Sequence, residues 1–213
     1  MVNKNGKDIM PIFPGGNDAT YEINMQAPYC VEVTIQGNAP LLLHRYDSDV
    51  VDAKSKAPKG SKIKKTDNLE SCVYRTEDGE IGIPGTYLAA AICIAAKSQQ
   101  DPRSPRKSAM DLFKAAVIPL TEIATLGAKD WDLVDRRPVI VNRARITRER
   151  PCFRPGWRAT FLFQILSPEY IVPDMLYQCI YDAGKLIGIG DFRPTFGRFQ
   201  PVHFEVLEDA PTL

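Results

Sequence analysis

The sequence predicts an α+β fold, in which a four-stranded antiparallel sheet carries two helices on one face. Alternating apolar residues predict four strands, at Cys30–Gln36, Val139–Arg148, Trp157–Ile165 and Pro201–Leu207. Apolar residues at helical spacing predict two helices, at Tyr87–Lys97 and from Pro173 to Ile187. The order strand, helix, strand, strand, helix, strand is that of the ferredoxin-like or RRM-like βαββαβ sandwich.

The amino-terminal half supplies the first strand and the first helix of this order. In the first strand Val31, Val33 and Ile35 alternate with polar residues, so one face is expected to be buried. A hairpin with strands at Ser71–Arg75 and Ile81–Ile83 follows. The helix after it begins at Pro84-Gly85-Thr86, where Thr86 is a suitable N-cap residue.

The carboxy-terminal half supplies the remaining elements. A linker at Gln99–Lys107 precedes a short helix at Ala109–Ala116 and a strand at Val117–Ile123. The two longest strand patterns, Val139–Arg148 and Trp157–Ile165, are predicted to pair as a hairpin. Its connection, which contains Phe153 and Arg154, would form a basic and aromatic tip. Pro173 then suits the first position of the last helix.

Two segments lie outside this pattern. Residues 1–28 contain too few apolar residues to form a core element, so we predict an N-terminal arm that is disordered or lies against a neighbouring molecule. Residues 47–68 are polar and rich in lysine, and we predict an exposed insertion. The remainder of 29–213 is expected to form a single domain.

The cysteines indicate a reducing environment. There are five, an odd number, widely spaced and without a Cys-x-x-Cys pair, and the chain has only two histidines. This pattern predicts reduced, mostly buried thiols in a cytoplasmic protein, without a zinc site, another metal or a cofactor. No apolar run approaches the ~18 residues of a membrane span, so we expect no membrane partner.

The charges are concentrated although the net charge is only +1. Between Arg136 and Arg158 there are eight arginines and one acid, Glu149. We predict a basic face that binds nucleic acid through Arg143, Arg145, Arg148 and Arg154. The alternative is that these arginines form salt bridges with neighbouring strands. A second block of basic residues, within 53–65, contains no acid and forms either a nucleic-acid-binding loop or a solvated loop. It consists of Lys54, Lys56, Lys59, Lys62, Lys64 and Lys65.

A glycine-rich segment connects the last helix to the last strand, from Leu186 to Phe204. Glycine allows a backbone to approach a bulky partner, arginine can bind phosphate, and an aromatic ring can stack on a base. The alternative is that the first two glycines only cap the helix and the phenylalanines belong to the core. The nucleic-acid-binding candidates here are Gly188, Gly190, Arg193, Phe196, Gly197 and Arg198.

A βαββαβ order with a glycine-rich loop before the last strand resembles the RAMP superfamily of CRISPR effector subunits and their relatives. The resemblance is carried by Gly188-Ile-Gly190 through Phe196-Gly197-Arg198, with Ile83-Pro84-Gly85 and the arginine-rich strand as weaker support. It is greatest to the backbone subunit that polymerises along a guide RNA, and to small relatives in phages and mobile elements. The resemblance implies an antiviral, non-catalytic protein that binds single-stranded RNA or DNA and assembles with its own copies and other effector subunits.

Two other functions stay open. The sequence contains no Walker motif and no nucleophile elbow. His44, beside Arg45 and Tyr46, is a candidate general acid or base for a metal-independent RNA endonuclease. A protein-interaction subunit without a nucleic-acid role is the third possibility.

Overall fold

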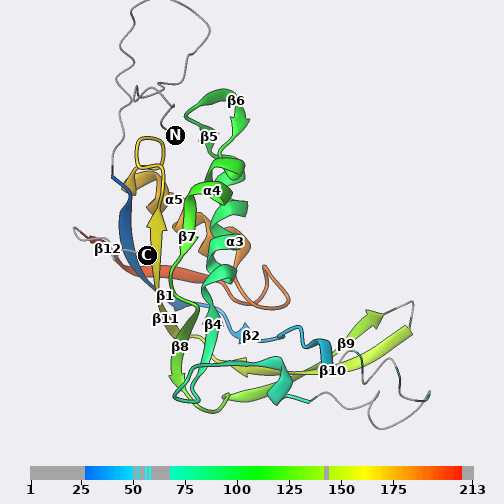
Figure 1. Cartoon of the computed structure of the whole chain (residues 1–213). Coiled ribbons are helices and arrows are strands. Elements are labelled where there is room, and N and C mark those ends of the chain that lie inside the picture. The colour runs from blue at the N-terminus through cyan, green and yellow to red at the C-terminus, as the bar shows by residue number, and fades with distance from the viewer. Residues whose placement is uncertain are drawn as a thin grey trace, which may run out of the picture.

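The computed structural model describes residues 27–49, 52, 56, 58, 68–141 and 144–207. Its central sheet has four antiparallel strands in the spatial order β12 (Phe199–Leu207), β1 (Tyr29–Gly37), β11 (Arg158–Ile165) and β7 (Val117–Pro119). Helices α3 (Gly85–Ala95) and α5 (Pro173–Asp182) pack together, with α4 (Met110–Ala116) beside α3 (Figure 1). The ferredoxin-like βαββαβ sandwich predicted from the sequence is confirmed.

The core lies between this sheet and the helices. Val31 and Val33 of β1 are fully buried, and they lie opposite Phe163 and Phe161 of β11. The helices contribute further buried residues to the same cluster, among them Leu88, Ile92, Leu176 and Ile180. The alternate residues of β1 are polar and lie on the other face, so the period-2 pattern in the sequence separates core from solvent as expected.

The second core strand is not the predicted one. The arginine-rich segment forms β10 (Ala144–Phe153), which pairs with β9 (Leu133–Val141) and with β2 (Leu41–Leu42) in a separate three-stranded sheet. The predicted hairpin between Val139–Arg148 and Trp157–Ile165 is therefore wrong, because β11 pairs with β1 and with the short β7. The β9–β10 hairpin projects away from the core sheet (Figure 1).

Smaller elements complete the chain. The hairpin of β3 (Tyr74–Arg75) and β4 (Ile81–Pro84) is confirmed, and β8 (Ile123–Ala128) extends it. The expected linker at 99–107 contains a second hairpin, β5 (Gln100–Asp101) and β6 (Ser104–Ser108). Short 3-10 turns lie at η1 (Glu70–Cys72) and η2 (Ala96–Ser98). Thr86 is not an N-cap, because α3 begins at Gly85, two residues before the predicted Tyr87, and Pro84 occupies the cap position.

The five cysteines are all free and buried, as predicted. None of the helices in the described ranges has the length and apolar character that a bilayer crossing requires. The predicted arm lies outside the described residues apart from its last two, and so does most of the predicted insertion.

Candidate nucleic-acid interface

The glycine-rich segment folds back on itself directly after the last helix. Helix α5 continues into a π-helical turn, η3 (Ala183–Ile187), which ends at Gly188 with φ +74°. The Ile189 amide donates to the Gly197 carbonyl at 2.9 Å, and the Gly197 amide donates to the Pro40 carbonyl at 2.8 Å. The segment is therefore held against both itself and the stretch that precedes β2.

The glycines make room for the chain's own backbone. A Cβ atom added at Gly197 would lie 1.7 Å from the carbonyl oxygen of Ile189, and one at Gly188 would lie 2.9 Å from that of Phe196. At Gly190 the corresponding distance, to the carbonyl oxygen of Leu42, is 2.5 Å. Gly188 also caps the helix, as the structural alternative predicted. Contact between these glycines and nucleic acid stays a prediction.

A partly buried ion pair joins this segment to the β9–β10 hairpin. Arg150 of β10 is only 7% exposed, and its Nε atom pairs with Asp191 Oδ2. The Arg150 guanidinium also lies 4.8 Å from the centre of the Phe192 ring, in a cation–π contact. Residues far apart in the sequence thus fix the base of the hairpin onto the glycine-rich segment.

A second arginine strengthens this contact. Arg137 of β9 lies over Phe196 at 4.4 Å and over Phe192 at 5.2 Å, each measured from Cζ to the ring centre. Its guanidinium is held in turn by Asp135, with nitrogen to oxygen distances of 2.5 and 2.6 Å. The stacking of a base on Phe196 stays a prediction, and a base would have to stack where Arg137 does not already lie over the ring.

Arg193 lies at a pocket beside the segment. A pocket of about 320 Å³ is lined by His44, Tyr87, Ala90, Gly190 and Arg193. Burial, and then a hydrogen bond with the Tyr74 hydroxyl, raise the pKa of Tyr87, so its phenol stays protonated at neutral pH. An exposed guanidinium, a phenol and an imidazole therefore meet at one opening, which suits an anionic ligand with a planar part.

The other predicted residues differ in what they offer a ligand. Arg145 and Arg154 are exposed, Arg148 is half-buried, and Arg198 is exposed with its Nε donating to the Pro194 carbonyl at 2.8 Å. Of the predicted lysines only Lys56 is described, and it is exposed. The others lie outside the described residues, together with one arginine; they are Lys54, Lys59, Lys62, Lys64, Lys65 and Arg143.

Several arginines form salt bridges, as the alternative interpretation expected. Arg136 pairs with Glu149 on the neighbouring strand at 2.8 Å, Arg137 pairs with Asp135, and Arg150 pairs with Asp191. Sequence reasoning missed Arg150, Asp191 and Tyr87 as parts of this region. One signal was available, because Asp191 is the only acid between Gly188 and Phe204 and an isolated acid among arginines predicts an ion pair.

No family model matches the chain, and no curated protein matches it. A cryo-EM structure of the Type III-B Cmr-beta bound to cognate target RNA has a similar fold, with a TM-score of 0.53 and 11% sequence identity. This chain therefore shares the fold of that structure. The match covers 85% of this chain and 61% of the other, so the chain spans about three fifths of its relative's length. A crystal structure of Thermofilum pendens Csc2 has 13% identity, a TM-score of 0.38, and coverage of 89% and 70%.

Proposed function

We propose that this protein binds single-stranded nucleic acid, RNA in preference to DNA, without cleaving it. The main support is the opening at which Arg193 meets Tyr87 and His44, on a fold shared with a structure described as bound to target RNA. A guanidinium offers a planar fork of donors to phosphate, and an aromatic side chain can stack on a base. The binding surface would continue along the exposed arginines of the β9–β10 hairpin.

The electrostatic part of binding would come from cations that are not already paired. Among the described residues, Arg145, Arg154, Arg193 and Arg198 are exposed and have no ion pair with another described residue. Each phosphate contact would release counterions, so the affinity would fall as salt is added. The lysines of the 47–68 insertion would add to this surface.

Assembly is the second part of the proposal. Residues 1–28 carry Ile9, Met10, Ile12 and Phe13, which would gain from burial against a neighbouring copy. A head-to-tail contact of this kind generates a filament or a ring, so the protein would form a repeating oligomer along the strand, in the cytoplasm, with or without other effector subunits. Deletion of residues 1–28 should then leave a folded monomer in size-exclusion chromatography.

The decisive experiment compares three substitutions that remove the same charge. Arg193→Gln and Arg198→Gln should each weaken binding of a labelled single-stranded RNA several-fold in fluorescence anisotropy, and reduce its salt dependence by about one phosphate contact. Arg106→Gln is the matched control, because Arg106 is also exposed but lies on β6, which is far from the β9–β10 hairpin (Figure 1). Equal effects at all three positions, or an affinity that does not change with salt, would contradict the proposal.

RNA cleavage is the second candidate, because His44 lies at the same opening as Arg193. An imidazole there could act as general acid or base on a phosphate held by the guanidinium. Incubation of the protein with end-labelled RNA distinguishes the functions. Shortened RNA that disappears with His44→Ala supports cleavage, intact bound RNA supports the proposal, and no bound RNA supports a protein-interaction subunit.

A further inference from the structure

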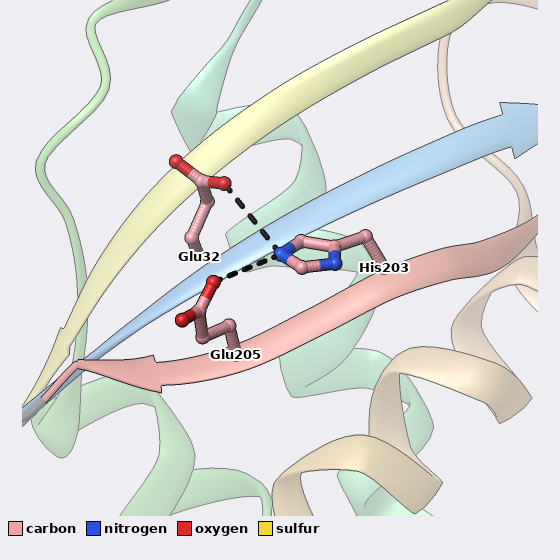
Figure 2. A group of neighbouring side chains, drawn as sticks. All are labelled: Glu32, His203 and Glu205. Atoms are coloured by element: carbon pink, nitrogen blue, oxygen red, sulfur yellow. Dashed lines mark hydrogen bonds and ion pairs between the residues drawn. The ribbon is translucent and has the colours of Figure 1, made fainter.

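A histidine and two glutamates meet on the outer face of the central sheet, outside the interface described above. Glu32 belongs to β1, and His203 and Glu205 belong to the neighbouring strand β12. Figure 2 shows the three side chains converging in front of the sheet, with the helices behind it. They therefore project from the polar face and not into the core.

The strand register brings the two carboxylates together. Glu32 lies directly opposite Glu205, and His203 lies opposite Thr34 on the same face. Like charges directly opposite each other on neighbouring strands are destabilising, unless a cation lies between them. The Nε2 atom of His203 is 3.3 Å from Glu205 Oε2 and 3.7 Å from Glu32 Oε1, so a single nitrogen faces both carboxylates.

The three groups have the spacing of metal ligands. One donor atom from each residue lies within 4.8 Å of the other two. In a tetrahedral zinc site, bonds of about 2.0 to 2.2 Å place neighbouring donors about 3.3 to 3.6 Å apart. The two distances from Nε2 lie in or next to this range, so small side-chain rotations would complete the geometry.

We propose that Glu32, His203 and Glu205 bind a divalent zinc ion. Imidazole nitrogen is a good ligand for zinc and a poor one for magnesium and calcium, which prefer oxygen. Three protein ligands leave a coordination position open, and the half-exposed side chains leave room for water there. Two carboxylates, a neutral imidazole and one Zn²⁺ sum to zero charge, so the ion would remove the repulsion between Glu32 and Glu205.

The experiment uses nuclease-treated protein, free of nucleic acid, so that its result does not depend on the proposed RNA binding. After dialysis against a chelator, calorimetric titration with zinc chloride should give one ion per chain, and the melting temperature should rise with zinc concentration. His203→Ala and Glu205→Gln should each lower the affinity by on the order of tenfold or more. Both replace half-exposed side chains outside the core, and circular dichroism checks that the variants are folded.

The other histidine provides the control. The Nδ1 atom of His44 lies 3.8 Å from the Cys72 sulfur, so this pair is the competing place for a thiophilic ion. His44→Ala should leave zinc binding unchanged. Cobalt(II) used as a probe should give a visible absorption band without the near-ultraviolet band of a thiolate ligand. Absence of binding up to millimolar zinc, full binding by both His203→Ala and Glu205→Gln, or a thiolate band would each overturn the proposal.

Discussion

Replacement of Gly190 by alanine tests what the glycine-rich segment is for. Gly190 has φ +78°, and an added Cβ would lie 2.5 Å from the Leu42 carbonyl oxygen. That carbonyl accepts a hydrogen bond from the Asp191 amide at 2.9 Å. Gly79 is a matched control, because its φ is +77° but nothing lies within 4 Å of the corresponding Cβ.

The two substitutions share one cost and differ in another. A left-handed alanine costs about 1 to 2 kcal/mol relative to glycine, and this applies at both positions. At Gly190 the steric overlap forces the backbone of β2 to move, which adds about 1 to 3 kcal/mol. We therefore expect losses of about 3 kcal/mol for Gly190→Ala and about 1 kcal/mol for Gly79→Ala. At about 2 to 4 °C per kcal/mol for a domain of this size, the melting temperatures should differ by about 4 to 8 °C.

Urea denaturation gives the free energies, and RNA anisotropy at a temperature where both variants are folded gives the affinities. Gly190 lines the candidate opening, but the Cβ atom added by Gly190→Ala would meet Leu41 and the Leu42 backbone, so we expect the folded fraction of this variant to bind RNA normally. Equal destabilisation of the two variants would refute the steric argument. Weak binding by a Gly190→Ala protein of unchanged stability would instead show that this glycine lies next to the ligand.

Three further outcomes follow from the contacts. Arg150→Met should lower the free energy of unfolding by about 2 to 3 kcal/mol in urea denaturation, less than the loss of a fully buried pair, because the Asp191 side chain is 30% exposed. The double variant Arg150→Met, Asp191→Leu should recover most of this stability, and additive losses would exclude the ion pair as the cause. Burial raises the pKa of Cys152 to about 11 and that of Cys179 to about 12, so a thiol reagent at neutral pH should label these residues slowly until the protein is unfolded. Fast labelling of the folded protein would contradict their burial. A variant with alanine at four lysines of the insertion should bind RNA more weakly with an unchanged melting temperature; the four are Lys54, Lys56, Lys62 and Lys64. Normal RNA binding by this variant would mean that the insertion is only a solvated loop.

The sequence predicted those strands whose alternation reflects a one-sided core. In β1 and β11 one face packs against helices, so apolar and polar residues alternate in register with burial. The same pattern in β10 identified a strand but not its partner, which depends on tertiary contacts such as Phe153 opposite Leu41. The single strand predicted at Val117–Ile123 is divided in the structure: β7 completes the core sheet beside β11, whereas Ile123 begins β8, which pairs with β4. Three residues are too few for a periodic signal that would have shown this division.

The candidate site was predictable in composition but not in geometry. Glycine, arginine and phenylalanine together indicated the segment that contributes Gly190 and Arg193 to the candidate opening, and its contact with nucleic acid stays a prediction. The partner of each group was not accessible from the sequence, because Arg150 and Asp191 come together only when the hairpin folds onto the segment. For the same reason Glu32 could not be linked to His203 and Glu205, whose proximity follows from the pairing of the first and last strands.

The charge available for nucleic acid is smaller than the composition suggests. Arg136 and Arg145 are both exposed and both belong to the β9–β10 hairpin, but Arg136 is paired with Glu149 at 2.8 Å, whereas Arg145 lies opposite Ile140. An arginine whose charge is already balanced by a carboxylate neutralises little phosphate charge, so its binding releases few counterions from the nucleic acid. Arg145→Gln should therefore reduce the slope of log affinity against log salt concentration by about 0.7, the value for one contact with a single strand, and Arg136→Gln should leave the slope unchanged. Equal reductions would mean that the Arg136–Glu149 pair opens on binding, and the basic face would then include the paired arginines as well.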